Sequence, residues 1–170
     1  MTLPAPVLPP TAAKIYPSAA AFAPVAAAWR AAGQRVVFTN GCFDLLHLGH
    51  VDYLERARTL GDALVVGLNT DASVRAQHKG PERPLQDEVS RARVLAALAF
   101  VDAVVLFGDR TPLDLIGLLR PHMLVKGDDY QGRHIAGADS VLADGGQVLT
   151  VPLVLGYGTT RIVEKIKAGL

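Results

Sequence analysis

The stretch "VVFTNGCFDLLHLGH", residues 36–50, decides the fold class, because it joins a buried strand to the start of a helix through a short turn. Val36–Thr39 is a run of β-branched and aromatic residues, which is typical of a buried strand. Gly41 lies in the turn, and a segment of helical character, Leu48–Leu60, follows. A strand followed directly by a helix is the unit from which parallel α/β sheets are built.

The same alternation repeats along the rest of the chain. Four more strands are expected at Ala63–Leu68, Ala103–Phe107, Met123–Lys126 and Gln147–Val151. Further helices are expected at Asp71–Gln77, Glu88–Phe100, Pro112–Leu119, Ala138–Ala143 and Thr160–Lys167. We therefore predict an α/β fold, a Rossmann-like doubly wound parallel sheet covered by helices on both faces. Ligands of such sheets bind at the carboxyl ends of the strands, here just after Thr39, Leu68, Val125 and Val151.

The first 34 residues are expected to form an N-terminal lead-in. Residues 1–17 contain five prolines and little periodicity, so we predict irregular structure there. An alanine-rich helix should follow, interrupted by Pro24 and ended by Gly33. Residues 35–170 are then expected to form the functional domain.

Composition excludes several classes of protein. The chain has 170 residues, enough for one domain, and its 17 Lys and Arg balance 16 Asp and Glu to a net charge of +1. No polybasic surface indicates a nucleic-acid or membrane partner. The single cysteine, Cys42, cannot form a disulfide within the chain, no signal peptide is evident, and no apolar run reaches the roughly 18 residues of a membrane span. A cytoplasmic protein is expected.

Two histidines stand at the expected helix start. At about 100° per residue, His47 and His50 lie about 60° apart around the helix, so both can face one point. Unpaired backbone N–H groups and the positive end of the helix dipole attract phosphate to that position. Gly41 would let backbone approach a ligand, and Gly49, which costs about 1 kcal/mol relative to alanine in a helix, indicates that the space above it matters.

Other interpretations of these residues remain open. Cys42, Asp44, His47 and His50 could bind zinc, although structural zinc sites usually show paired spacings and a second cluster. Cys42 could be a nucleophile with His47 as its base, but no oxyanion-hole motif accompanies it. The histidines could also satisfy hydrogen bonds in a core. The glycines and the strand-to-helix context favour the phosphate site.

Several motifs resemble one family. "HLGH" (47–50) is similar to the HxGH motif of nucleotidyltransferases, which join a nucleoside triphosphate to a phosphorylated small molecule and release pyrophosphate. "FTNGCFDLLHLGHVDYLERARTLGD", "VVGLNTDASVRAQHKGPERP", "LVKGDDY" and "GTTRI" follow in the order of one branch. Over about residues 35–167 the chain resembles the D-glycero-β-D-manno-heptose 1-phosphate adenylyltransferases, which make ADP-heptose for lipopolysaccharide precursors and also occur as the C-terminal half of a bifunctional kinase and adenylyltransferase.

The resemblance implies ATP and heptose 1-phosphate as substrates, Mg²⁺ accompanying ATP, a homodimer, and no nucleic-acid or membrane partner. His122, Asp128 and Arg110 depart from the usual residues of the branch, and "GDDY" is also similar to the glycerol-phosphate cytidylyltransferases. Glycerol 3-phosphate with CTP therefore stays open as an alternative reaction. A non-catalytic nucleotide-binding regulator is a different alternative. An oxidoreductase is disfavoured, because no GxGxxG follows the first strand.

Roles for individual residues follow mainly from the resemblance. Catalysis is assigned to His47, His50, Lys126 and Arg161. ATP binding is assigned to Thr39, Asn40, Gly41, Cys42, Phe43, His47, Gly49, His50, Lys126, Gly127, Thr159, Thr160 and Arg161. Substrate contacts are assigned to Asp44, Lys79, Arg91, Asp128 and Asp129, and no metal site made by protein ligands is expected.

Five of these residues have structural alternatives. Lys79 could be a solvated loop lysine, and Asp128 and Asp129 could be solvated acids. Arg91, at the edge of the apolar side of its expected helix, could form a salt bridge instead of binding an anion. Thr160 could be an ordinary helix N-cap.

Overall fold

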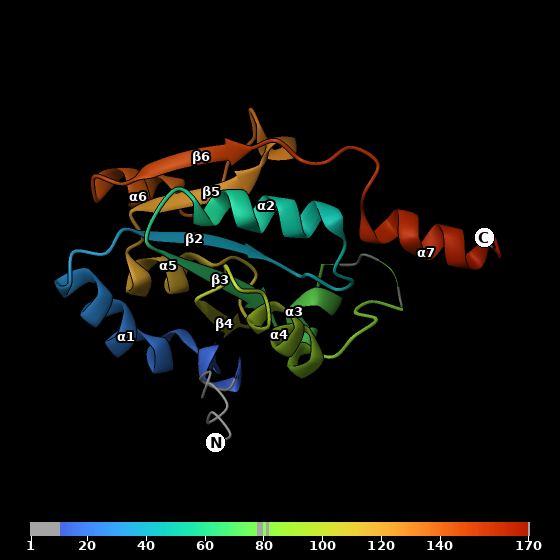
Figure 1. Ribbon diagram of the computed structural model, residues 1–170, viewed down its shortest axis with the longest axis horizontal. Coiled ribbons are helices and arrows are strands. Elements are labelled where there is room, and N and C mark those ends of the chain that lie inside the picture. Colours follow the sequence, from blue (N-terminus) through green and yellow to red (C-terminus); the bar gives the residue numbers. More distant parts are fainter. Residues whose placement is uncertain (1–10, 78–79, 81, 170) are drawn as a thin grey trace, which may run out of the picture.

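The computed structural model describes residues 11–77, 80 and 82–169. In this part of the chain six strands form one parallel sheet in the order β1-β4-β3-β2-β5-β6 (Figure 1). The strands are β1 (Ile15–Tyr16), β2 (Val36–Gly41), β3 (Ala63–Asn69), β4 (Ala103–Phe107), β5 (Met123–Gly127) and β6 (Gln147–Val151). The predicted parallel α/β sheet is confirmed.

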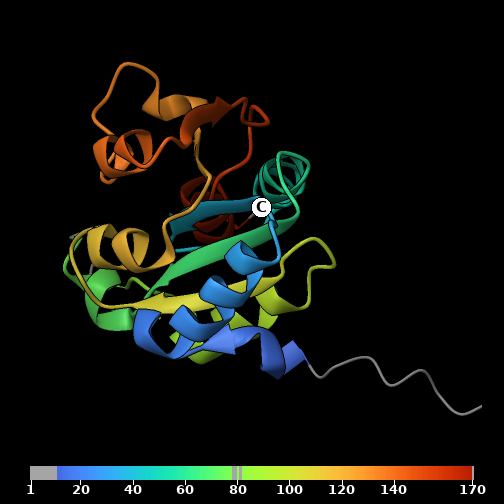
Figure 2. The same ribbon diagram turned by 90° about the vertical axis from the view of Figure 1, so that its left-hand side faces the viewer.

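Helices cover both faces of this sheet (Figures 1 and 2). The α-helices are α1 (Ala19–Ala31), α2 (Leu48–Arg58), α3 (Asp71–Arg75), α4 (Glu88–Ala96), α5 (Leu113–Leu119), α6 (Ala138–Ala143) and α7 (Thr159–Lys167), and two 3₁₀ helices are η1 (Thr11–Lys14) and η2 (Asp128–Tyr130). One core lies between the sheet and α2 with α4, and contains Leu54 and Leu95. The other lies between the sheet and α1, α5 and α6, and contains Phe22 and Ile116. No helix in the described residues is long and apolar enough to cross a membrane.

Strand β2 lies in the middle of the sheet, between β3 and β5, and its first four residues are buried. A run of buried residues is typical of a parallel strand that is covered on both faces. The chain runs from β2 to β3 and β4 on one side, and then returns to place β5 and β6 on the other side. The strand order therefore reverses beside β2. In open α/β sheets a ligand crevice forms at the carboxyl ends of the strands at such a point. The turn that follows β2 is the segment that carries His47 and His50.

The expectation of irregular structure up to residue 17 is wrong for the described part of that segment. Ile15 and Tyr16 form β1, which pairs in parallel with Val104 and Val105 of β4. Lys14 Nζ donates to the carbonyl of Val101 at 2.7 Å. A strand of two residues carries no periodic pattern, so only the tertiary contact reveals it.

Helix α1 also differs from its prediction, since it runs without interruption through Pro24. A proline inside a helix costs about 3 kcal/mol, because it removes one hydrogen bond and crowds the preceding turn. Burial of Phe22 and Ala26 offsets this cost, and the Phe22 ring packs edge-on against Tyr16 at 4.7 Å and Trp29 at 5.5 Å. The N-terminal segment thus belongs to the same sheet and core as the rest of the chain.

Candidate active site

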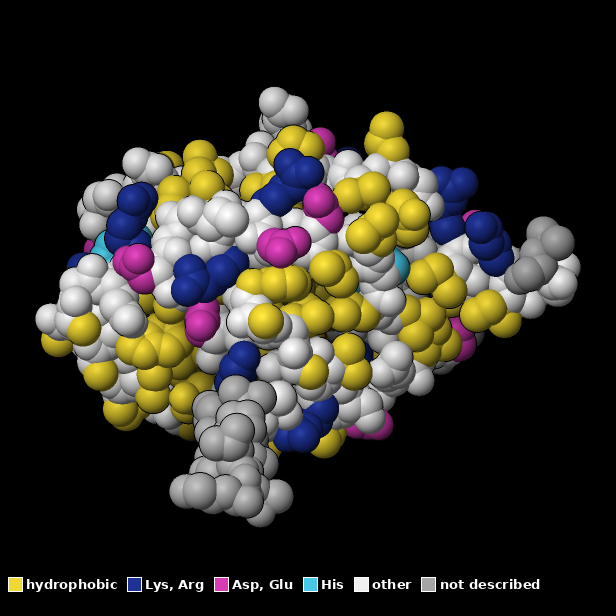
Figure 3. Space-filling model, in the orientation of Figure 1, with side chains coloured by type: hydrophobic (Ala, Val, Ile, Leu, Met, Phe, Trp, Pro, Cys, Tyr) yellow, Lys and Arg dark blue, Asp and Glu magenta, His cyan; other side chains and the backbone are white. Residues whose placement is uncertain are grey.

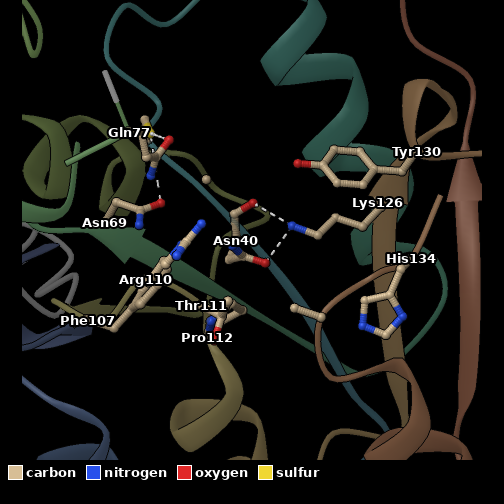
Figure 4. Close-up of a pocket in the computed structure, with 13 residues that line it drawn as sticks. Asn40, Asn69, Gln77, Phe107, Arg110, Thr111, Pro112, Lys126, Tyr130 and His134 are labelled. Atoms are coloured by element: carbon tan, nitrogen blue, oxygen red, sulfur yellow. Dashed lines mark hydrogen bonds between the residues drawn. The ribbon is translucent and has the colours of Figure 1, made fainter. Parts of the chain in front are cut away.

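A pocket of about 270 Å³ opens at the carboxyl ends of β2, β3, β4 and β5 (Figure 4). Its position is the reversal point of the strand order. The residues that line it are Asn40, Gly41, Cys42, Asn69, Gln77, Phe107, Arg110, Thr111, Pro112, Lys126, Tyr130, His134 and Ala136. Asn40, Gly41, Cys42 and Lys126 were singled out in the sequence.

Lys126 forms one wall of the pocket and is held in place by its neighbours. It is the penultimate residue of the buried strand β5, and its Nζ donates to Asn40 Oδ1 at 2.5 Å and to the Asn40 carbonyl at 3.1 Å. The ammonium also lies 5.2 Å from the centre of the Tyr130 ring, within the range of a cation–π interaction. A positive charge is therefore fixed at the sheet edge where an anionic ligand would enter.

Arg110 is a pocket residue that the sequence reasoning noticed only as a departure from the family pattern. In Figure 4 its side chain extends from the end of β4 toward the space between Asn69 and Asn40. The guanidinium makes no hydrogen bond or ion pair with any described residue. Ligands of parallel sheets bind at the carboxyl ends of the strands. Phe107 is the last residue of β4, so the same rule, applied to β4, would have pointed to Arg110.

His47 and His50 stack on each other beside this pocket, at the start of α2. Their ring centroids are 3.8 Å apart and the ring planes differ by 21°. His47 is the N-cap of α2 and makes no side-chain cap hydrogen bond. Nδ1 of each ring is buried without a hydrogen-bond partner in the described structure. Buried polar atoms are nearly always satisfied, so these two nitrogens indicate a site for a ligand.

Burial sets the charge of the two histidines. It lowers the pKa of His47 below its ordinary value. Burial and the neighbouring His47 lower the pKa of His50 from 6.5 to about 4, against the opposing effect of a hydrogen bond with the Leu45 backbone. His50 is therefore neutral at pH 7. A bound polyphosphate would oppose this shift, because a nearby negative charge favours the imidazolium.

The start of α7 lies next to the start of α2. Thr159 Oγ1 donates to the carbonyl of Leu45 at 3.5 Å, and Figure 1 shows α7 beyond the carboxyl ends of the strands. Figure 3 shows histidine surface, in cyan, near the place where α7 joins the body of the molecule. Gly158 is the N-cap of α7, with no side-chain cap bond, so the interpretation of Thr160 as the N-cap is wrong. Two helix N-termini with unpaired N–H groups thus meet at the histidine pair.

The two glycines of this region make room for protein groups, which differs from the expectation of space kept for a ligand. A Cβ on Gly49 would lie 3.1 Å from the His47 ring and 3.3 Å from Tyr157 Cβ. A Cβ on Gly41 would lie 3.0 Å from the Phe43 ring, and that ring packs 5.0 Å from His50. The glycines therefore allow the histidine pair, Phe43 and the chain before α7 to pack closely.

Two residues assigned to ligand binding have structural contacts instead. The Thr39 side chain is fully buried, and its hydroxyl lies 2.6 Å from that of Tyr53, which donates to the carbonyl of Val125. Asp44 is also buried, and its Oδ1 accepts hydrogen bonds from the backbone N–H groups of residues 85 and 86. Its second oxygen lies 3.1 Å from Arg83. These contacts fix the loop after β2 and leave neither side chain facing the pocket.

Arg91 likewise forms the salt bridge that was the alternative to binding an anion. Its side chain is 0% exposed, and it forms an ion pair with Asp71 at 2.6 Å. The prediction that Arg91 contacts substrate therefore does not fit this structure, because the guanidinium cannot reach a ligand while it is buried. Lys79 lies outside the described residues.

The two acids after β5 differ in their contacts. Asp128 Oδ1 accepts from the backbone N–H of Leu153 at 3.3 Å, while Asp129 is exposed in η2. A Cβ on Gly127 would lie 2.5 Å from Asp129 Oδ1 and 2.9 Å from Leu153 Cδ1, so a side chain there would require these two side chains to shift. The described residues contain no group of three or more His, Cys, Asp or Glu that could hold a metal ion, which also removes support for the zinc interpretation.

Comparison with known proteins identifies the family. A model of the cytidylyltransferase-like family matches residues 38–143, more than half of the chain and the region that holds the pocket and the histidine pair. The chain belongs to this family of nucleotidyltransferases.

Several curated proteins have high sequence identity to this chain. The chain is 62% identical over 142 residues to the bifunctional protein HldE of Magnetococcus marinus and 54% identical over 162 residues to that of Azorhizobium caulinodans. These matches cover 84% and 92% of this chain but only 29% and 34% of the relatives. The chain thus spans about a third of the length of the proteins that it resembles.

Two solved structures show the same fold. A lipopolysaccharide core biosynthesis protein from Thermoplasma volcanium superposes with a TM-score of 0.60 at 30% identity, covering 72% of this chain and 98% of that protein. A pantoate-beta-alanine ligase from Francisella tularensis superposes with a TM-score of 0.57 at 14% identity, covering 90% of this chain and 76% of that one, and it supports the fold alone.

Proposed function

We propose that this chain transfers the adenylyl group of ATP to D-glycero-β-D-manno-heptose 1-phosphate, giving ADP-heptose and pyrophosphate for lipopolysaccharide precursors. The observation that carries this proposal is the position of the stacked His47–His50 pair, between two helix N-termini and beside a cationic pocket. High identity to the HldE proteins supports the choice of substrates. The homodimer and the cytoplasmic location belong to the same proposal.

The nucleotide triphosphate would lie over the starts of α2 and α7. Backbone N–H groups at both helix starts, the imidazole rings of His47 and His50, and the Thr160 and Arg161 side chains are donors suited to phosphate oxygens. Arg161 is exposed, so its guanidinium could contact the β- and γ-phosphates. These groups would stabilise the negative charge that develops on pyrophosphate as it leaves.

The acceptor would occupy the pocket. Its phosphate is already a competent nucleophile, so the site needs cations that position it and no activating base. Lys126 and Arg110 provide these charges from β5 and from the end of β4, and Asn69 and Gln77 offer hydrogen bonds to sugar hydroxyls. One phosphate oxygen of the acceptor would then attack the α-phosphorus in line, while the bond to pyrophosphate breaks.

Magnesium would arrive with the nucleotide. The described residues offer no cluster of three ligands, so the ion would be held mainly by phosphate oxygens. When bound, Mg²⁺ neutralises phosphate charge. The chain's own contribution is to orient the two substrates and to donate hydrogen bonds.

Pyrophosphate release tests the proposal. Four nucleoside triphosphates are each incubated with Mg²⁺ and either heptose 1-phosphate or glycerol 3-phosphate, and release is followed over time. We expect release with ATP and the heptose. Release only with CTP and glycerol 3-phosphate would support a nucleotidyltransferase with those substrates instead. Nucleotide binding without any release would favour a non-catalytic nucleotide-binding regulator.

A further inference from the structure

Arg91 reaches three separate segments from inside the protein. Its Nε donates to the carbonyl of Gln86 at 3.0 Å, one terminal nitrogen donates to the carbonyl of Cys42 at 2.6 Å, and the other pairs with Asp71 at 2.6 Å. Asp71 N–H in turn donates to the Glu88 carboxylate at 2.7 Å. The guanidinium therefore links the starts of α3 and α4 to the loop that follows β2.

The contact with Cys42 fixes the direction of one peptide group. The bond between Cys42 and Phe43 is trans, and in a trans peptide the C=O and the N–H point in opposite directions. Because the Cys42 carbonyl points at Arg91, the Phe43 N–H must point away from it. That N–H has no acceptor among the described residues.

The backbone at Phe43 is also strained. Its φ is +45°, in the left-handed region that residues other than glycine rarely adopt. A strained backbone conformation persists only where surrounding contacts hold it in place, and such residues are common at active and binding sites. Here the contacts are the Arg91 bond on one side and the packing of the Phe43 ring against His50 on the other.

We propose that Arg91 is a positioning residue: it holds the 42–43 peptide so that the Phe43 N–H donates a hydrogen bond to a non-bridging oxygen on the α-phosphorus of the transferred adenylyl group. This inference rests on the proposed function for the identity of that group. A buried guanidinium suits the task, because it is planar and always charged and so holds its three acceptors at fixed angles. A lysine has a flexible stem and lacks this planar fork.

Kinetics of Arg91→Lys test this role, with Arg30→Lys as the matched control. Arg30 also donates to backbone carbonyls, those of Leu119 and Arg120, at the opposite end of the sheet. We expect Arg91→Lys to lower kcat about 10- to 100-fold with KM for ATP within about threefold, as for loss of an oriented backbone donor. Arg30→Lys should leave kcat unchanged. Equal kcat in the folded Arg91→Lys variant and the parent would overturn the proposal.

An NMR titration tests the same point without turnover. The Phe43 amide proton of the ¹⁵N-labelled parent should move downfield when α,β-methylene-ATP is added, and should move in Arg30→Lys but not in Arg91→Lys. A parent amide that does not respond while the analogue binds would contradict the role of Arg91, even if Arg91→Lys failed to fold. Because the titration needs binding alone, its result is independent of whether heptose 1-phosphate is the acceptor.

Discussion

At the scale of single residues, the site combines a fixed cation, Lys126, with two histidines whose pKa values are lowered by burial. Lys126 is fixed by Asn40, whereas the stacked His47 and His50 rings, 3.8 Å apart, cannot easily carry charge together. One of the two imidazoles would thus take up a proton when the triphosphate binds, because phosphate oxygens then replace water around the rings. The same burial has a cost in stability that can be measured without any substrate.

The stability of the free protein should fall as the pH falls. The pKa of His50 is about 4 in the folded protein and 6.5 in the unfolded chain, so between these values the unfolded chain binds the proton and folding excludes it. His50 alone should therefore lower the free energy of unfolding by about 2 kcal/mol between pH 7.5 and pH 5. Urea unfolding of the parent and of His50→Gln at both pH values measures this difference.

The pH dependence should shrink in His50→Gln by that amount. Identical pH dependence in the parent and His50→Gln would show that His50 is not held neutral by the fold.

Arg110 should act on the acceptor and not on ATP. Removing its guanidinium takes one charge from the pocket that we assign to heptose 1-phosphate, while Lys126 remains. We expect Arg110→Ala to raise KM for the acceptor about tenfold, as for the loss of one charge-assisted hydrogen bond of about 1.4 kcal/mol, with KM for ATP unchanged. Steady-state kinetics with each substrate varied in turn measures both. A rise in KM for ATP alone would reverse our placement of the two substrates.

At the scale of the elements, α7 is attached to the rest of the protein by few contacts. None of its residues is buried, and its side-chain hydrogen bonds to other described residues are those of Thr159 with Leu45 and of Lys167 with Glu82, the latter at 3.0 Å. Removal of residues 159–170 should therefore lower the free energy of unfolding by only about 1 kcal/mol and abolish binding of ATP. Thermal unfolding and calorimetric titration with ATP test both parts.

Lys167→Gln provides the control for that truncation. It removes an exposed ion pair and should leave both stability and ATP binding as in the parent. If the truncated chain bound ATP as well as the parent does, the start of α7 would not be part of the phosphate site.

The elements that could be predicted from the sequence are those with a strong local pattern. The strands β4 and β6 and the helix α6 have the predicted bounds, because apolar runs and flanking glycines mark them. Strand β1 and the passage of α1 through Pro24 depend on contacts with distant residues, so no local pattern reveals them. The roles of Thr39, Asp44 and Arg91 could not be predicted for the same reason, since their partners Tyr53, Gln86 and Asp71 are set by packing.

At the scale of the whole molecule, one edge of the sheet collects every group that the proposed reaction needs. The strand order reverses beside β2, so the ends of β3, β4 and β5 surround the turn that carries His47 and His50. This is why residues from 40 to 161 along the chain can act on one ligand. The HldE relatives are about three times as long as this chain.

The central claim is that the histidine pair stabilises charge during adenylyl transfer. The most direct test is kcat for pyrophosphate release from saturating ATP and heptose 1-phosphate, measured for the parent and for His50→Ala. We predict a fall of at least about 100-fold, the usual consequence of removing an oriented donor to a developing negative charge. A kcat within about threefold of the parent, a barrier difference well under 1 kcal/mol, would contradict the account.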